Sequence, residues 1–260
     1  MELKLLKYEV KGNVGVITIN RPEVLNAIDV AVITELNLLL DEIDADSTIG
    51  ALVITGEGRA FSAGGDIAEE LKQDMRGAYH FSRCGAQVTS RLETFRCPVI
   101  GAINGYALGG GMEFALACDI RFAAEGVKLG MPEITLAVFP GWGGTQRLPR
   151  LIGLSKAKRL IYSGKPVKAE EALELGMVDF VVPADKLIGE AVAFAQDLAE
   201  NAPLAMKAVK QAINQGMQMD LEKGLELESL LFAPLYGTED QHEAMTAFLE
   251  KRAPRPFKGK

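Results

Sequence analysis

The chain has 260 residues, of which 48% are hydrophobic and 24% charged, and its formal net charge is −7 at pH 7. This balance supplies enough apolar material for a packed core and excludes a disordered or fibrous protein. No run approaches the roughly 20 apolar residues of a membrane span, and the acidic charge opposes a general nucleic-acid surface. The charged first seven residues are unlike a secretory signal, so we expect a cytoplasmic protein or a mature chain. We expect no membrane or nucleic-acid partner.

Short runs rich in β-branched residues predict strands at 14–19, 51–55, 98–103 and 178–182. Between them, apolar residues recur at spacings of three and four, which predicts amphipathic helices. The two clearest stripes are Ile33, Leu36, Leu40 and Ile43, then Phe81, Cys84, Val88, Leu92 and Phe95. The alternation indicates an α/β fold, and the regular recurrence of the first three strands allows strand-and-helix units stacked in series.

The strand signal disappears after about residue 203. Residues 204–248 are rich in Met, Leu and Glu and predict two or three helices, with breaks near Gly216, Gly237 and Pro254. Their apolar stripes must bury against the core or against another copy of the chain, and periodicity does not decide between these. We therefore expect a core of residues 1–200 and a helical region of residues 201–260. Residues 251–260 carry basic groups and no acid, a run that could meet a phosphate-bearing ligand but is more often solvated.

Cysteine and histidine chemistry finds little support in the sequence. The three cysteines, Cys84, Cys97 and Cys118, have neither the even count nor the spacing of a disulfide framework. The two histidines, His80 and His242, lie in polar helical settings. Neither a histidine-based triad nor a histidine-rich metal site is expected, so we predict no bound metal.

Glycine clusters mark places where a ligand can approach the backbone. The clusters are Gly64-Gly65, Gly109-Gly110-Gly111, and Gly141 with Gly143-Gly144. None matches a nucleotide-binding loop, and tight turns explain most such clusters. The middle cluster, however, leads into an apolar helical pattern, and Gly64-Gly65 precedes the helix that Asp66 opens. Free N–H groups there favour negative charge, and two such donors from two segments suit an oxyanion.

Two isolated carboxylates lie beside these glycines. Glu113 is the only charged residue between Cys97 and Cys118, and Glu133 is the only one between Leu129 and Gln146. Desolvation should raise the pKa of each carboxyl group and make it able to exchange protons near neutrality. Helix capping or pairing with an arginine is an equally common role for a lone buried glutamate. The pair beside glycine-rich segments favours acid–base work.

Two other residues near the glycines are weaker candidates. Ser62 lacks the nucleophile-elbow pattern around it and is interpreted as structural. Trp142 could belong to the core or form the wall of a pocket. The glycines on both sides of it favour the pocket, because they would leave the ring exposed on a turn.

Five segments, in order along nearly the whole chain, resemble the signature segments of the crotonase (enoyl-CoA hydratase/isomerase) superfamily. They are NRPEVLNA at 20–27, AFSAGGDI at 60–67, NGYALGGGME at 104–113, PGWGGTQRL at 140–148, and the ending TEDQ at 238–241 with MTAFLEKR at 245–252. The ending is similar to the hydratases in particular. The resemblance implies a crotonase-type spiral of ββα units, followed by a helical C-terminal region that forms trimers, with hexamers as dimers of trimers.

The resemblance also assigns catalytic roles. It places the family's oxyanion donors on the N–H groups of Gly65 and Gly110, and its two hydratase glutamates on Glu113 and Glu133. The related isomerases need only the position of Glu133, so both acids together argue for water addition. The implied substrate is an acyl-CoA, and no cofactor beyond that coenzyme A is expected.

The resemblance further implies substrate and CoA contacts. These fall on Leu25, Ala27, Ala63, Asp66, Ile67, Ala68, Gly141, Trp142, Phe248 and Lys251. The segment from Gly65 to Ala68 should run along the thioester end, and Leu25 and Ala27 should lie near the adenosine part. Phe248 and Lys251 match positions that reach the CoA of a neighbouring subunit, which gives the basic tail a use.

The expected reaction is syn hydration of a trans-2-enoyl-CoA to the 3-hydroxyacyl-CoA. Glu113 would deprotonate the water that attacks C3, and Glu133 would deliver a proton to C2. Three residues depart from the commonest hydratase pattern: Gly65 replaces alanine, Met131 replaces glutamine, and Trp142 replaces a smaller residue. The bulk of Trp142 predicts a preference for short acyl chains such as crotonyl.

Other activities remain open from the sequence. A relative of this family could instead be an isomerase, a dehydratase or a hydrolase of another CoA thioester. Some relatives bind RNA through a lysine-rich face, and others are non-catalytic scaffolds. The net charge of −7 argues against RNA, and a scaffold has no reason to hold both acids.

Overall fold

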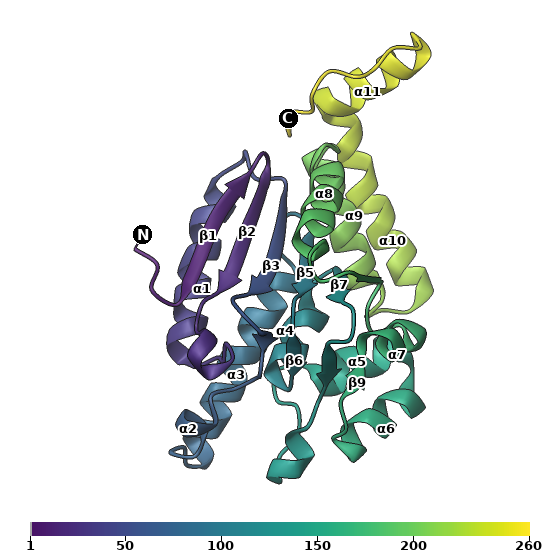
Figure 1. The fold of residues 1–260 in the computed structure, drawn as a ribbon. Helices are drawn as coiled ribbons and strands as arrows, with labels where there is room; N and C mark the ends of the chain where they lie inside the picture. The colour runs from purple at the N-terminus through teal and green to yellow at the C-terminus, as the bar shows by residue number, and fades with distance from the viewer. Residues whose placement is uncertain (1) are drawn as a thin grey trace.

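The computed structural model describes residues 2–260, and its frame is a pair of sheets (Figure 1). The larger sheet has the order β1-β2-β3-β5-β7-β10 and is parallel except for β1. Its strands are β1 (Leu6–Lys11), β2 (Val14–Ile19), β3 (Ala51–Gly56), β5 (Val99–Ile103), β7 (Ile120–Ala124) and β10 (Phe180–Val182). The four strands expected from the sequence correspond to β2, β3, β5 and β10, so all four are confirmed.

The smaller sheet has the order β4-β6-β8-β9, with only β9 antiparallel. Its strands are β4 (Ala60–Ser62), β6 (Tyr106–Leu108), β8 (Lys128–Gly130) and β9 (Val167–Lys168). Three successive pairs of strands each contribute one strand to the larger sheet and the next strand to the smaller sheet, and a helix then follows. The pairs are β3 with β4, β5 with β6, and β7 with β8. This repetition confirms the expected α/β spiral of ββα units.

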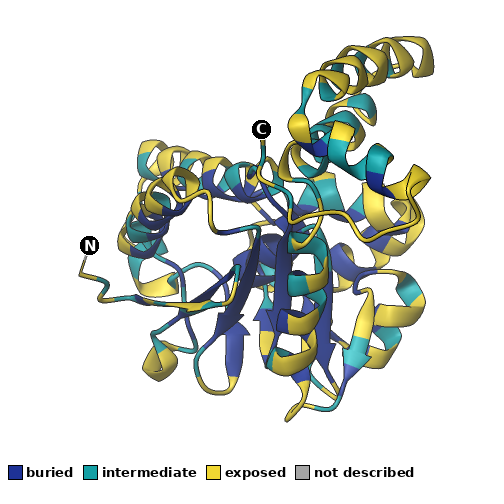
Figure 2. Cartoon of the chain, turned by 90° about the horizontal axis from the view of Figure 1, so that it is seen from above, coloured by how far each residue is buried: buried dark blue, intermediate teal, exposed yellow. Residues whose placement is uncertain are grey.

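Helices cover both faces of the larger sheet. The helical elements before the C-terminal region are η1 (Pro22–Val24), α1 (Val30–Ala45), α2 (Ile67–Glu70), α3 (Met75–Glu93), α4 (Gly110–Ala117), η2 (Glu133–Leu136), α5 (Gly144–Ile152), α6 (Leu154–Ser163), α7 (Ala169–Leu175) and α8 (Leu187–Ala199). The buried stripes of α1, α3 and α4 pack into the main core, whereas α8 packs on the opposite face of the sheet. Figure 2 shows the strands as the buried centre between these layers. No helix among residues 2–260 is both long enough and apolar enough to cross a bilayer.

The C-terminal region is helical and projects from the body of the molecule (Figure 1). It comprises α9 (Pro203–Gly216), α10 (Leu221–Phe232), η3 (Ala233–Gly237) and α11 (Glu239–Leu249). The breaks at Gly216 and Gly237 are confirmed. Neither α9 nor α10 contains a buried residue, although both carry apolar side chains, and Figure 2 shows this region as largely exposed. The apolar stripes therefore stay uncovered within a single chain.

A partly buried ion pair fastens the C-terminal region to the core. The Lys210 ammonium group on α9 donates to Asp119 Oδ2 at 2.7 Å and to the carbonyl oxygen of Cys97 at 3.1 Å. The side chain of Lys210 is 9% exposed. Burial raises the pKa of Asp119, and the charge of Lys210 opposes that rise. The pair thus compensates two charges at the base of α9.

Candidate active site

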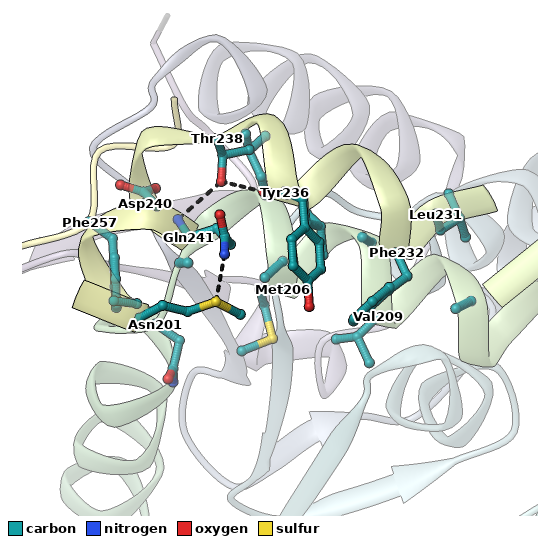
Figure 3. Close-up of a pocket in the computed structure, with 18 of the residues that line it drawn as sticks. Asn201, Met206, Val209, Leu231, Phe232, Tyr236, Thr238, Asp240, Gln241 and Phe257 are labelled. Atoms are coloured by element: carbon teal, nitrogen blue, oxygen red, sulfur yellow. Dashed lines mark hydrogen bonds between the residues drawn. The ribbon is translucent and has the colours of Figure 1, made fainter. Parts of the chain in front are cut away.

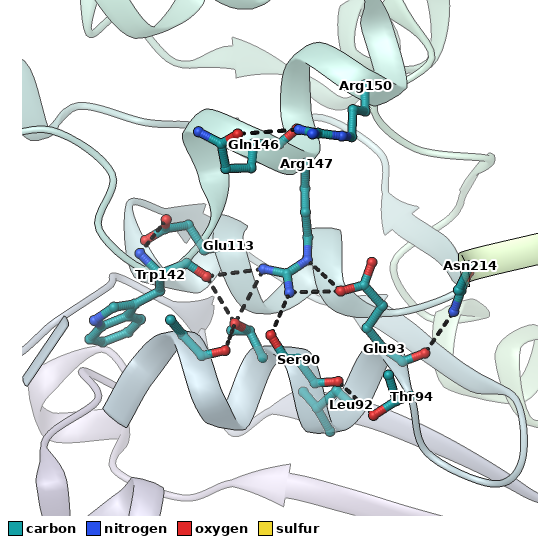
Figure 4. Close-up of polar contacts among 12 residues, drawn as sticks. Ser90, Leu92, Glu93, Thr94, Glu113, Trp142, Gln146, Arg147, Arg150 and Asn214 are labelled. Carbon is teal, nitrogen blue, oxygen red and sulfur yellow. Dashed lines mark hydrogen bonds and ion pairs between the residues drawn. The ribbon is translucent and has the colours of Figure 1, made fainter. Parts of the chain in front are cut away.

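Glu113 lies in the first turn of α4 and is 2% exposed. Its Oε1 accepts two backbone hydrogen bonds, both of 2.7 Å, from the N–H groups of Trp142 and Gly144. Figure 4 shows the bond from Trp142. Its Oε2 accepts no hydrogen bond from residues 2–260. Burial raises the pKa of Glu113 to about 7, although both amides favour the charged form. The carboxyl group is therefore held by one oxygen and can exchange a proton at the other.

Glu133 begins the short helix η2, and both of its carboxyl oxygens are buried without a hydrogen-bond partner among the described residues. Burial raises the pKa of Glu133 to about 7, and the neighbouring charges of Glu113 and Glu70 also act to raise it. A buried, unpartnered carboxyl group costs free energy in folding unless a ligand satisfies it. Its retention here is typical of a functional group.

The two carboxyl groups meet at one turn of the backbone. Gly109 precedes α4, and its carbonyl oxygen accepts the N–H of Glu113 at 3.0 Å. A Cβ atom on Gly109 would lie 3.2 Å from Glu133 Oε1, and the φ angle of +53° also favours glycine there. The Glu133 carboxyl group therefore lies against Gly109, four residues before Glu113, and the charge of Glu113 acts on it.

The amides of Gly65 and Gly110 lie on adjacent segments. A Cβ atom on Gly64 would be 3.2 Å from the nitrogen of Gly110, which places the two glycine clusters in contact. The N–H of Ile28 donates to the carbonyl oxygen of Gly64 at 2.8 Å, and the carbonyl oxygen of Ile28 accepts the N–H of Asp66 at 3.0 Å. In this strand-like pairing the amide of the intervening Gly65 faces away from Ile28. Neither Gly65 nor Gly110 donates its amide hydrogen to another described residue. Both donors are free for a ligand oxygen.

Trp142 explains why α4 begins with glycine. A Cβ atom on Gly110 would overlap the indole ring, and one on Gly111 would overlap the carbonyl group of Ser62. The ring packs edge-on against Phe81 and Phe114, with centroid distances of 5.2 and 6.0 Å. The helix N-terminus is thus pressed against an aromatic cluster and a strand end, and only glycine fits.

The expectation that Trp142 is exposed on a turn is wrong, because its side chain is buried and only 4% of the residue is exposed. The backbone of Trp142, between the two glycines, forms the polar contacts here, and its ring forms none with residues 2–260. The N–H of Trp142 holds Glu113, and its carbonyl oxygen accepts hydrogen bonds from Thr89 at 2.8 Å and Arg147 at 3.0 Å. Trp142 therefore belongs to the core and supports the site through its backbone.

Arg147, for which the sequence predicts no role, links α5 to α3. It donates to Glu93 Oε2 at 2.8 Å and to the carbonyl oxygen of Trp142 at 3.0 Å (Figure 4). Its charge also opposes the rise in the pKa of Glu113. A basic residue three positions after the Gly143-Gly144 pair was the available signal, but its partners on α3 could be found only from the fold.

The segment expected along the thioester follows Gly65 directly. Asp66 caps α2 by accepting the N–H of Ala68 at 3.1 Å, and its other oxygen pairs with Arg21 at 3.3 Å. Ile67 and Ala68 are exposed, as a ligand-facing segment requires. The carbonyl oxygen of Leu25 accepts the N–H of Ala63 at 2.9 Å, so residues 25–27 border this segment.

Asn26 was not predicted to matter on its own. It is fully buried, and its side-chain amide donates to the carbonyl oxygens of Glu57 at 2.9 Å and Ala60 at 2.7 Å. Its oxygen accepts the N–H of Arg21 at 2.9 Å. Asn26 therefore fixes the loop that carries Leu25 and Ala27. Asparagine between two small or apolar residues was the only sequence signal.

Two expected contact residues lie far from this site. Phe248 and Lys251 are at the end of α11 and just beyond it, at the opposite end of the molecule from α2 and η2 (Figure 1). Phe248 is 82% exposed. Gly141, in contrast, lies beside the site, where its carbonyl oxygen accepts the hydroxyl of Ser82 at 2.8 Å. Phe248 and Lys251 therefore cannot contact a ligand at Glu113 of their own chain.

Comparison with known proteins identifies the family of the chain. The family model described as Enoyl-CoA hydratase/isomerase matches residues 9–260. The short-chain-enoyl-CoA hydratase of Clostridium acetobutylicum is 45% identical over 100% of both chains, and the 2,3-dehydroadipyl-CoA hydratase of Escherichia coli is 42% identical over 94% of each. The solved enoyl-CoA hydratase of Bacillus anthracis matches with a TM-score of 0.95 at 40% identity, over 99% of this chain and 100% of that one. The chain belongs to the enoyl-CoA hydratase/isomerase family, as its crotonase-like motifs implied.

Proposed function

We propose that the chain is an enoyl-CoA hydratase, a hydro-lyase that adds water across a trans-2-enoyl-CoA to give a 3-hydroxyacyl-CoA. One observation carries the proposal. Two buried carboxyl groups, Glu113 and Glu133, lie at one turn beside the free amide of Gly110, and burial raises the pKa of each to about 7. Such a pair can supply a base and an acid together at neutral pH.

The thioester carbonyl would bind to the amides of Gly65 and Gly110. Conjugation makes C3 electrophilic, and attack there moves negative charge to the carbonyl oxygen. Two preorganised N–H donors stabilise that charge, and the dipole of α4 adds to their effect at Gly110. Loss of one such donor costs about 3–4 kcal/mol in the transition state.

The two acids would move the protons. Glu113 orients water through Oε2 and takes one of its protons as the oxygen bonds to C3. Glu133 then delivers its own proton to C2, so the product gains one H and one OH. Afterwards Glu113 is protonated and Glu133 ionised, and a proton exchange between them or with solvent restores the starting state. The addition of water is not a redox reaction, so it needs no redox cofactor. We propose no cofactor beyond the CoA of the substrate.

The test is the loss of absorbance of crotonyl-CoA on hydration. We expect Glu113→Gln and Glu133→Gln to lower kcat at least about 100-fold, as removal of a general acid or base does, while CoA binding is kept. Glu125→Gln, at an exposed turn after β7, serves as the matched control. Near-normal turnover in either site variant refutes the assignment. Product analysis with a β,γ-enoyl-CoA separates hydration from isomerisation.

We also propose that the active form is a trimer or a dimer of trimers. The apolar residues of α9 and α10 are uncovered, and the C-terminal helices enclose a hollow of about 880 Å³ with mostly apolar walls. Figure 3 shows Met206, Val209, Phe232 and Tyr236 around this hollow. A second copy seated there would bury the stripes and bring Phe248 and Lys251 toward a neighbouring CoA.

A cytoplasmic location is the accompanying proposal. Cys84, Cys97 and Cys118 are all unpaired thiols, and the last two are buried. Free thiols suit a reducing compartment. Recovery of activity in the cytosolic fraction after gentle lysis tests the location, and recovery only from a secreted or membrane fraction contradicts it.

A further inference from the structure

A third acid, Glu70, lies beside the proposed oxyanion site. It is the last residue of α2, five positions after Gly65. A Cβ atom on Gly65 would overlap Glu70 Oε1 and would lie 3.5 Å from Phe81 Cε1. The missing side chain at Gly65 therefore makes room for the Glu70 carboxyl group beside the glycine.

The charge of Glu70 reaches both proposed catalytic acids. It acts to raise the pKa of Glu113 and of Glu133. Burial raises the pKa of Glu70 itself, and the charges of Asp66 and Glu69 add to this effect. Within residues 2–260, the Glu70 carboxyl group forms no ion pair and no hydrogen bond. Its negative charge is not compensated by a nearby cation.

An acyl chain whose carbonyl oxygen binds the Gly65 amide would lie near this carboxyl group. The carbonyl oxygen would rest on Gly65 and Gly110, and C3 would face Glu113. The Glu70 carboxyl group fills the space beside Gly65 that a side chain there would occupy, so it would lie beside the bound thioester. An uncharged acyl chain would meet no opposing charge there, whereas an anionic chain end would meet an uncompensated like charge.

We propose that Glu70 is a specificity residue that excludes enoyl groups ending in a carboxylate, an inference that rests on the proposed hydratase function. Two like charges a few ångströms apart in a partly buried site disfavour binding by about tenfold or more. The substrates that remain are enoyl-CoAs with uncharged acyl groups. Glu70 acts on the choice of substrate, whereas Glu113 and Glu133 act on the reacting atoms.

The experiment compares two enoyl-CoAs of matched shape. One is trans-glutaconyl-CoA, whose chain ends in a carboxylate, and the other is trans-5-methyl-2-hexenoyl-CoA, which carries two methyl groups in place of the carboxylate oxygens. The measured quantity is the ratio of kcat/KM for the charged substrate to that for the neutral one. We expect Glu70→Gln to raise this ratio at least about tenfold, because the amide removes the charge and keeps the shape.

Two further variants separate charge from other effects. Glu69→Gln removes an equal charge on the same helix, where Glu69 contacts the N–H of Val30, and should leave the ratio within about twofold. Glu70→Met also removes the charge and should raise the ratio as the glutamine variant does. A ratio unchanged in Glu70→Gln, or raised only in Glu70→Met, overturns the inference. Failure of the wild-type chain to hydrate crotonyl-CoA would instead overturn the proposed function.

Discussion

At the scale of single residues, the pH dependence of the reaction follows from two carboxyl groups in opposite protonation states. Glu113 must be ionised to accept a proton from water, and Glu133 must be protonated to give one to C2. Burial raises the pKa of each to about 7, so the ionised form of Glu113 is lost below that pH and the protonated form of Glu133 is lost above it. Because the groups interact, the two apparent values belong to the pair.

We therefore expect a bell-shaped profile of kcat/KM for crotonyl-CoA, with its maximum near pH 7. Each limb should fall about tenfold per pH unit at its far end. Initial rates measured from pH 5 to 9 at constant ionic strength check this. A profile that is flat across the range would show that the two acids do not divide the work in this way.

Trp142 supports a second prediction at this scale. Its ring fills the space beneath Gly110 and packs on Phe81 and Phe114, which closes the core on that side. We expect kcat/KM to fall as the acyl chain lengthens from four to ten carbons, and Trp142→Phe to reduce that fall. A series of straight-chain enoyl-CoAs measures it. A rate that stays level or rises with length in the wild-type chain would count against the prediction.

At the scale of elements, a partly buried ion pair holds α9 to the core. Lys210→Met would leave the Asp119 carboxylate buried without its partner, while the methionine still fills the space. We expect the free energy of unfolding to fall by about 3 kcal/mol, the usual cost of breaking such a pair. Urea unfolding followed by circular dichroism checks it. Lys207→Met, at an exposed position on the same helix, should change stability by less than about 0.5 kcal/mol.

The elements differ in how far the sequence could predict them. The continuous apolar runs of β2, β3 and β5 and the stripes of α1 and α3 are long enough for periodicity to be read. The strands of the smaller sheet have two or three residues each, too few for any pattern. β7 was missed because Arg121 interrupts its apolar run, and the structure pairs that arginine with Asp179 at 3.2 Å.

The site was more predictable than its surroundings. Glu113, Glu133 and the two glycine segments could be selected because isolated charge and clustered glycine are local signals. The contacts that support them join distant parts of the chain, such as Trp142 with Glu113 and Arg147 with Glu93. No local pattern reports them. Glu70 was missed because it lies among other acids in an ordinary amphipathic segment, and only the fold shows its carboxyl group against Gly65.

At the scale of the whole molecule, a single chain leaves too much apolar surface uncovered at its C-terminal helices. Leu221, Leu230, Phe232 and Leu249 are each more than half exposed. Exposed apolar patches of this kind mark association surfaces in soluble proteins. The division between a core of residues 1–200 and a helical region of residues 201–260 stays a prediction. The contact from Lys210 joins α9 to the core across that boundary.

We expect light scattering to give a particle mass of three or six times the 28.0 kDa of one chain. Phe232→Asp should lower that mass by placing a charge on the apolar face of α10, and Glu222→Gln, on an exposed position of the same helix, should not. CoA affinity should fall together with the mass if Phe248 and Lys251 serve a neighbouring subunit. A stable 28.0 kDa particle with normal CoA affinity would contradict both parts.

The two amides on Glu113 Oε1 also decide how an inactive form for trapping complexes should be made. Alanine at that position would leave the N–H groups of Trp142 and Gly144 buried without an acceptor, and the loop between η2 and α5 would rearrange. Glutamine keeps an acceptor oxygen for both amides. A crystal of the glutamine variant soaked with an unreacted enoyl thioester would then show the ligand in a pocket of native shape.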